Sequence, residues 1–378
     1  MKARTRNKRT GGKETRYQIT PTTNIENVSL KQFLSHPTTK QDLTVYLTQY
    51  SVGMLGDKRY AITYDTVTVT NIGDFAEDIC THDHEEADTL LILHAIDVAK
   101  RNPFSECFVY SPDTDVFLLL LYYAESLTQV TFFRTGRGID LRDINIHSCY
   151  EALGATKSKA LLGFHTFTGC DQTGRLFNGI SKTSWWKQFS VAENSVLDAF
   201  AQLGSSECLP SLATLEALES FVVKLYGGTQ RPHDMLTIPS LRWFLFCKNQ
   251  HDVERLPPTM GALKNKVFRS HYITLVLRRS HLSHQHLPNP LNYGWENLDN
   301  ILVPIMTDDL PAPLALIELS VCKCKGSCVN RRCKCVKHNL VCTDMCKCKS
   351  CENDGNGYDQ SDEDSDINVD SDDNDDEF

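Results

Sequence analysis

Nine cysteines crowd into thirty residues near the end of the chain, and this spacing constrains the fold more than any other feature. The segment reads C-x-C-x3-C-x4-C-x-C-x6-C-x3-C-x-C-x2-C. Thirty residues bury too little apolar surface to form a stable core, so covalent or metal links must hold the segment together. The cysteines are Cys322, Cys324, Cys328, Cys333, Cys335, Cys342, Cys346, Cys348 and Cys351.

The expected compartment favours metal over disulfides. The N-terminus is basic and lacks the apolar stretch of a secretory signal. No apolar run reaches the roughly 18 residues that a membrane span needs. We therefore expect an intracellular protein in a reducing compartment, where clustered thiolates bind metal. Tetrahedral thiolate sites suit zinc, and nine sulfurs satisfy about three Zn ions if three of the sulfurs bridge.

The cysteine segment resembles the tesmin-type CXC domain along its full length, which implies a zinc module over residues 320–353. Members of that family bind DNA through the minor groove, so the resemblance implies DNA as a partner. Many relatives carry two copies and a Tyr before the fourth cysteine, where this chain has one copy and Arg332. Basic residues also surround the cysteines, with Asp344 as the one acid among them. The positions expected to contact DNA are Lys323, Lys325, Arg331, Arg332, Lys334 and Lys337. The alternative is that these cations only offset thiolate charge.

A pair of carboxylates follows a predicted strand in the middle of the chain. The residues Phe108 to Tyr110 suit a short buried strand, and Pro112 ends it because proline lacks the backbone donor. Asp113 and Asp115 then stand at the C-terminal end of that strand. Ligands of open α/β sheets bind beyond this edge.

A second acidic cluster, His82 to Asp88, lies upstream. Asp83 and Glu86 have the spacing of a capping box, and an apolar stripe follows, so a helix is expected to start here. Acids at this position can simply stabilise the positive end of a helix. The pair His82 and His84 is interpreted either as metal ligands or as ordinary surface histidines.

Strand and helix patterns alternate around these acids. Arg59 to Thr70 and Gln129 to Phe133 suit strands, whereas Lys31 to Tyr50 and Asp143 to Leu153 suit helices. This alternation predicts an α/β fold with a mainly parallel sheet flanked by helices. Helical patterns continue through residues 191–315, which we expect to form a helical extension.

The order Glu86-Ala-Asp88, Ser-Pro-Asp113-Thr-Asp115 and Gly-Cys-Asp171 resembles the acidic motifs of the flap-endonuclease branch of PIN-like nucleases. The resemblance implies a nuclease domain over residues 29–190. It also implies that two Mg²⁺ or Mn²⁺ ions are held for phosphodiester hydrolysis. The implied catalytic residues are Glu86, Asp88, Asp113, Asp115 and Asp171. That family places another metal-binding Asp on an earlier strand, so we expect the domain to be N-terminally incomplete.

The whole chain also resembles a multicopy group of animal proteins with a mobile-element character. The motifs that carry this resemblance are Leu256-Pro-Pro-Thr259, Gly294-Trp295, Pro311-Ala-Pro313 and the cysteine-rich end. The resemblance implies an origin from a transposon.

The formal net charge of −9 conceals two oppositely charged parts. Thirteen of the 48 acidic residues lie from Glu352 onward, where no Lys or Arg occurs, which leaves 39 basic and 35 acidic residues elsewhere. We expect a basic disordered arm over residues 1–28 and an acidic disordered tail over 354–378, with the tail able to contact basic proteins. A further basic set is expected either to face phosphate or to form a solvated helix face: Lys264, Lys266, Arg269, Arg278 and Arg279.

These patterns predict a nuclear DNA-binding protein that joins a divalent-metal-dependent DNA endonuclease to a zinc anchor. Neither a membrane nor a small-molecule cofactor is expected. The alternative is a catalytically inactive nuclear DNA-binding or scaffold protein acting through its CXC domain, and a third option is an RNA-directed PIN nuclease.

Overall fold

The computed structural model describes residues 15–73, 75, 77–174, 180–227, 237–247, 256–309, 321–337, 341–342, 346–349 and 351–353. The chain divides into two compact units, Met1–Asp309 and Leu310–Phe378. The expected acidic tail and the first half of the expected basic arm lie outside the described residues. The second half of the arm is held in place, because the Tyr17 N–H donates to Thr39 Oγ1 and the Tyr17 ring packs on Phe33.

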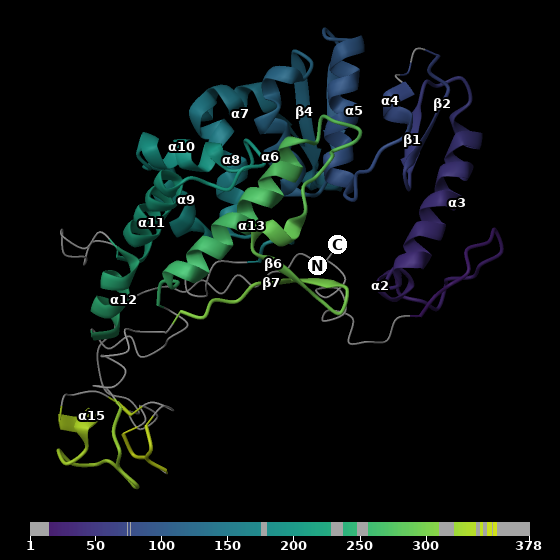
Figure 1. The fold of residues 1–378 in the computed structure, drawn as a ribbon. Helices are drawn as coiled ribbons and strands as arrows, with labels where there is room; N and C mark the ends of the chain where they lie inside the picture. Colours follow the sequence, from purple (N-terminus) through teal and green to yellow (C-terminus); the bar gives the residue numbers. More distant parts are fainter. Residues whose placement is uncertain are drawn as a thin grey trace. The chain divides into compact units, whose positions relative to one another are not determined.

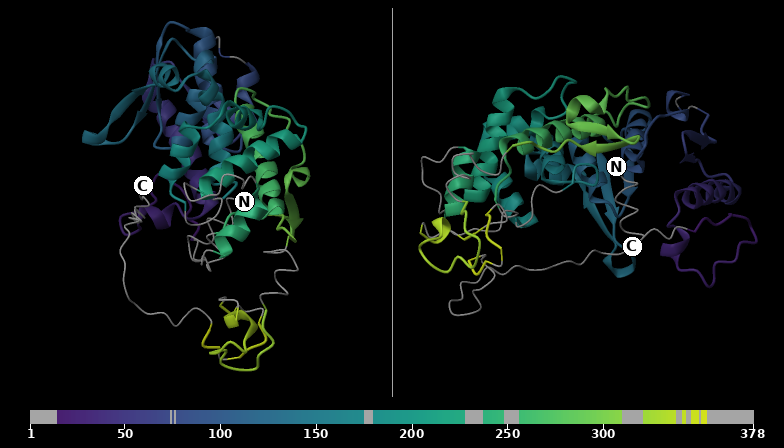
Figure 2. Two further views of the ribbon diagram at one scale, coloured as in Figure 1. Left: turned by 90° about the vertical axis from the view of Figure 1, so that its left-hand side faces the viewer. Right: turned by 60° about the horizontal axis from the view of Figure 1, so that its bottom comes forward.

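The first unit is a mixed α/β fold around a three-stranded sheet (Figure 1). Its strands are β3 (Glu106–Tyr110), β4 (Val130–Thr135) and β5 (Arg142–Asn145), in the order β3-β4-β5. β3 runs parallel to β4, as expected, but β5 is antiparallel to β4. The six residues that join β4 to β5 are too few for the crossover that a parallel pair needs. The expected mainly parallel sheet is therefore present in one strand pair only, and the β4–β5 turn projects away from the helices (Figure 2).

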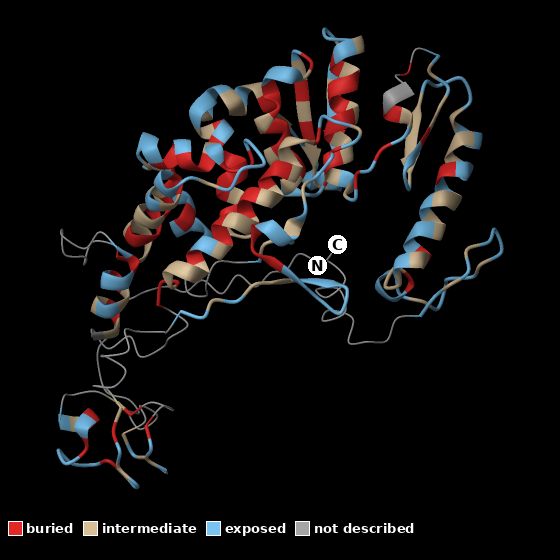
Figure 3. Cartoon of the chain, viewed as in Figure 1, coloured by how far each residue is buried: buried red, intermediate tan, exposed pale blue. Residues whose placement is uncertain are grey.

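Helices cover one face of this sheet. They are α5 (Ala87–Arg101), α6 (Thr114–Tyr122), α7 (Ile146–Leu153) and, behind them, α8 (Ala155–Thr168). Figure 3 shows buried residues along the inner sides of these helices. The opposite face carries Phe108 and Tyr110, whose side chains are 44% and 54% exposed, so only Val109 of the expected buried strand is buried.

The N-terminal elements differ from the sequence expectation in two places. The single helix expected over Lys31 to Tyr50 is divided into α2 (Leu30–Phe33) and α3 (Pro37–Leu55), because proline favours the first turn of a helix. The strand expected over Arg59 to Thr70 is a hairpin of β1 (Ala61–Tyr64) and β2 (Val67–Thr70). Asp65 makes the turn with a φ of 52°, a conformation that Asp tolerates better than most residues. A short helix, α4 (Glu77–Cys80), follows.

The predicted helical extension shares the hydrophobic core of the preceding domain. The aromatic rings of Phe164, Phe189, Phe200 and Phe221 meet there, with Phe164 and Phe189 stacked at 4.3 Å. Residues 191–309 thus continue the first unit and do not form a separate body. The elements are α9 (Lys182–Ser190), α10 (Asn194–Gln202), α11 (Leu212–Gly227), α12 (Ile238–Cys247), α13 (Met260–Arg278), η5 (Pro290–Tyr293), β6 (Trp295–Leu298) and β7 (Ile301–Pro304).

Gly163 sets the approach of α8 to α10. A Cβ at this position would lie 2.1 Å from the Phe200 carbonyl oxygen, so Gly163→Ala forces the two helices apart. We expect the substitution to lower the free energy of unfolding by about 1–3 kcal/mol or more, measured by urea denaturation. Gly53→Ala is the control, because a Cβ on α3 meets nothing within 4 Å and should be neutral or stabilising. Equal effects of the two substitutions would contradict the close packing of α8 and α10.

Candidate functional site

The cysteine sulfurs of the second unit lie at the separations that a shared tetrahedral metal requires. Cys322 Sγ is 3.8 Å from Cys328 Sγ, 3.9 Å from Cys342 Sγ and 3.7 Å from Cys348 Sγ. A tetrahedral zinc site with Zn–S bonds of about 2.3 Å places its sulfurs about 3.8 Å apart. A disulfide needs about 2.05 Å, and all nine cysteines are free thiols. The donor set and its spacing therefore fit zinc.

Among the described residues, three overlapping groups of four cysteines have sulfurs that all lie within 4.8 Å of one another. Cys322 belongs to all three groups and Cys328 and Cys342 belong to two each, whereas Cys351 belongs to none. The groups are Cys322/Cys335/Cys342/Cys346, Cys322/Cys328/Cys342/Cys348 and Cys322/Cys324/Cys328/Cys333.

The backbone and burial around the sulfurs also suit a metal. Amide groups donate to them at 3.4 Å: the Cys322 N–H to Cys346 Sγ, and Asn353 Nδ2 to Cys342 Sγ. Burial raises the pKa of the Cys335 thiol, and the neighbouring Cys346 raises it further. A nearby cation reverses this effect, because it stabilises the thiolate form that metals bind.

Cysteines and cations segregate in this unit. Six cysteines are buried and form its core, whereas the intervening basic residues are exposed. One short helix, α15 (Lys334–Lys337), follows Cys333. The exposed set includes every position expected to contact DNA: Lys323, Lys325, Arg331, Arg332, Lys334 and Lys337.

Two helix N-termini bring carboxylates together in the first unit. Asp113 is the N-cap of α6 and accepts the Asp115 N–H at 2.9 Å, while Asp88 lies in the first turn of α5. The structure places oxygens of Asp88, Asp113 and Asp115 within 4.8 Å of one another. Carboxylate oxygens at this spacing suit a hard divalent cation. The same residues also stabilise the positive ends of their helices, so a structural role is the competing explanation.

The other two predicted acids do not join this group. Glu86 is the N-cap residue of α5, and Asp171 is exposed in the turn that follows α8. The structure thus brings together three of the five carboxylates expected at the site.

The expected capping box is wrong. The N-cap of α5 is Glu86, and the Asp83 carboxylate instead accepts the Gln285 N–H at 2.9 Å. His82 and His84 are buried and not on the surface, and burial lowers the pKa of both. His84 Nε2 lies 2.7 Å from the Leu282 carbonyl oxygen. This segment therefore anchors the chain that follows α13, and neither histidine belongs to a candidate metal group in the described part of the chain.

One residue beside the carboxylate group was not predicted from the sequence. His165, near the end of α8, places Nε2 3.0 Å from Asp115 Oδ1. This nitrogen is shielded from solvent, yet its geometry satisfies no hydrogen bond. The available signal was an ionisable side chain within the mainly apolar stretch 160–167 of α8.

The expected basic face of α13 is directed partly inward. Lys266 is 3% exposed, and its Nζ donates to the carbonyl oxygens of Thr173 and Gly174. Arg278 donates to the carbonyl oxygens of Ala201 and Leu203. These cations hold the protein together and do not form a phosphate-facing surface. Lys266 in particular stabilises the turn that carries Asp171.

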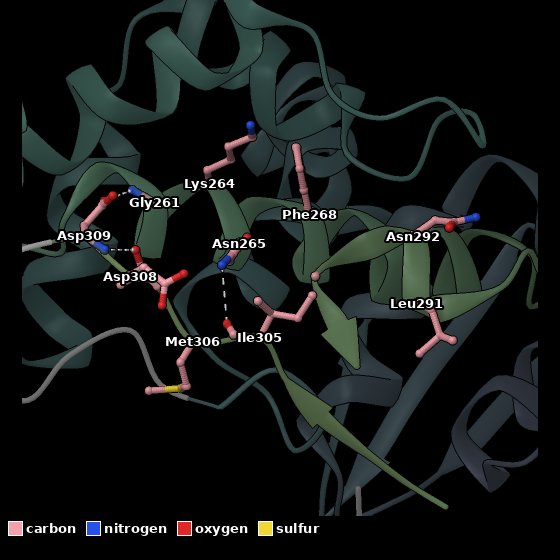
Figure 4. Close-up of a pocket in the computed structure, with 12 residues that line it drawn as sticks. Gly261, Lys264, Asn265, Phe268, Leu291, Asn292, Ile305, Met306, Asp308 and Asp309 are labelled. Carbon is pink, nitrogen blue, oxygen red and sulfur yellow. Dashed lines mark hydrogen bonds between the residues drawn. The ribbon is translucent and has the colours of Figure 1, made fainter. Parts of the chain in front are cut away.

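A separate groove of about 490 Å³ lies along α13. Figure 4 shows Asp309 pointing to Gly261, whose N–H it accepts at 2.5 Å, and Asn265 pointing to Ile305. The groove is lined by both polar and apolar residues, and none of them belongs to the candidate cysteine or carboxylate metal groups.

No protein-family model matches the chain, and no curated protein or solved structure matches it either. Across the described helices, none is both long and apolar enough to span a membrane.

Burial makes Lys266 a source of pH-dependent stability. Desolvation lowers its pKa to about 7, whereas an unfolded lysine has a pKa of about 10.4. Between these values the unfolded chain binds the proton that the folded chain does not. The contribution of Lys266 to the free energy of unfolding should therefore rise from pH 7 to pH 10 by about 1.4 kcal/mol per pH unit. This contribution is lost again as the pH falls back toward 7.

Lys266→Met should abolish this slope, measured as the difference in urea-unfolding free energy between wild type and variant at pH 7, 8.5 and 10. The exposed Lys264→Met is the matched control and should leave the slope unchanged. A constant difference between wild type and Lys266→Met would show that Lys266 stays charged when buried.

Proposed function

We propose that this chain is a nuclear DNA-binding protein, anchored by a tesmin-like CXC module that binds three zinc ions. One observation carries the proposal: sulfurs at tetrahedral separations lie inside a shell of exposed lysines and arginines. The zinc would hold the short segment folded and leave its cations on the outside.

The distribution of charge favours a polyanion as partner. Besides the six positions named above, Lys347 and Lys349 are also exposed in this unit. Dense cations displace the counterions condensed on DNA, which drives binding without sequence preference. Arg331 and Arg332 lie side by side on the surface, and arginine suits a narrow minor groove.

Zinc and DNA binding can be tested on the full chain. Metal analysis should give about three Zn per chain, and one or none would contradict the cluster.

Lys323→Gln/Lys325→Gln should lower DNA affinity about tenfold and reduce the slope of log K against log salt by about 2. The control is Lys182→Gln/Lys187→Gln, which removes the same charge from exposed positions on α9. If both double variants bind equally, the CXC cations do not contact DNA.

A transposon-derived, PIN-like nuclease activity is a second candidate function, favoured by the grouping of Asp88, Asp113 and Asp115. In this proposal the three carboxylates hold Mg²⁺ or Mn²⁺, and Glu86 and Asp171 complete a two-ion site by approaching it on binding. The bound ions would supply an activated water and stabilise the leaving oxygen. The rival is a catalytically inactive scaffold protein, and the N-cap role of Asp113 favours it.

Cleavage decides between these two. Purified chain with Mn²⁺ should cut flap, nicked or single-stranded DNA, and Asp113→Asn/Asp115→Asn should lower the rate at least 100-fold. Asn is as good an N-cap as Asp, so the variant should keep α6 intact. Circular dichroism checks this. Wild-type cleavage no faster than that of the variant would leave only the DNA-binding function, and preferential cleavage of RNA would indicate the RNA-directed option.

A further inference from the structure

The surface of the cysteine unit carries charge of nearly one sign. Among its described residues, every lysine and arginine is exposed, and Glu352 is the one exposed acid. Cations crowded on so small a module repel one another, so the surface attracts any polyanion within reach. The exposed cations are Lys323, Lys325, Arg331, Arg332, Lys334, Lys337, Lys347 and Lys349.

The last described residues are bound to this module by their backbone. The Glu352 N–H donates to the Ser327 carbonyl oxygen at 3.0 Å, and the Asn353 carbonyl oxygen accepts the Cys342 N–H at 2.6 Å. Ser327 stands two residues after Lys325. The segment that follows Asn353 therefore starts at the module itself, close to the stretch that carries Lys325.

That segment is the acidic tail, residues 354–378. It contains twelve acidic residues, which are the thirteen counted from Glu352 onward less Glu352 itself, and it has no Lys or Arg. Eight residues separate Asn353 from the denser acidic part, 362–377, and eight residues can span up to about 26 Å. A module of thirty residues has a radius of gyration of about 8 Å, so the acids can reach all of its surface.

We propose that the acidic tail binds the exposed cations of the cysteine unit within the same chain and competes with DNA for them. The inference rests on the proposed DNA binding by this surface. Phosphates of DNA and carboxylates of the tail neutralise the same lysines and arginines, so the two polyanions exclude each other.

The covalent link gives the tail an advantage over DNA that is free in solution. A segment tethered by a short linker has an effective concentration in the millimolar range. If the tail occupies the cations about 90% of the time, the apparent DNA affinity falls tenfold. Salt weakens the contact, because the Debye length falls from about 10 Å at 0.1 M to about 3 Å at 1 M.

Replacing the ten acidic residues of 362–377 by their amides tests the competition in the zinc-loaded full chain. The variant should bind a labelled DNA duplex at least tenfold more tightly than wild type at about 50 mM salt, and the difference should shrink below about threefold at about 200 mM. The matched control is a chain in which the order of residues 354–378 is shuffled. It keeps the charge and should bind like wild type, and metal analysis checks that both variants retain zinc.

Carbodiimide coupling of the wild-type chain without DNA tests the contact directly, because this reagent joins carboxylates to amines that already touch. Mass spectrometry should find tail carboxylates linked to Lys323 and Lys325 within one chain, and 1 M salt should remove the links. The exposed Lys182 and Lys187 of α9 serve as the control and should stay unlinked.

The outcomes separate this inference from the function on which it rests. Equal DNA affinity of wild type and the amide variant at about 50 mM salt would overturn the inference and leave DNA binding intact. If neither chain binds DNA, the proposed function fails, whereas links to Lys323 and Lys325 would still show that the tail occupies the cations. Links that join two chains, or that reach Lys2, Lys8 and Lys13 in place of the cysteine unit, would assign the tail to another partner and overturn the inference.

Discussion

Both candidate sites crowd together donor atoms that carry negative charge or acquire it on binding a metal, and such atoms need a counter-charge. Asp88, Asp113 and Asp115 lie within 4.8 Å of one another, and the sulfurs around Cys322 lie less than 4 Å away from it. Crowded carboxylates repel one another when ionised, and buried thiols resist ionisation. A bound cation would remove both penalties, and the donor atoms of both sites suit a metal ion.

The two sites meet this constraint by different means. In the cysteine unit, a metal would serve as the core, since the buried residues there are the cysteines themselves. In the first unit, a conventional hydrophobic core positions the ligands, and the N-termini of α5 and α6 offset part of the carboxylate charge. If each site holds a metal ion, its removal should unfold the cysteine unit, whereas the first unit should keep its fold.

Sequence reasoning succeeded where the signal was local. Pro112 marked the end of β3, and the cysteine spacing predicted sulfurs close enough to share a metal ion. It failed where a distant segment decided the outcome. Asp83 matched a capping box by its spacing, but Gln285, two hundred residues on, takes its carboxylate. The basic residues of α13 resembled a solvated face, yet Lys266 is buried against the turn at Thr173.

The sequence by itself determined the chemistry of the cysteine segment, because thiolate spacing within thirty residues leaves the chain few ways to arrange its ligands. It also identified Asp113 and Asp115 as acids that follow a strand. Only the tertiary structure decided that Asp88 meets Asp113 and Asp115, that Asp171 lies apart from them, and that His165 stands beside Asp115. Such neighbours come from separate helices, and the packing of side chains in the shared core sets how those helices approach one another.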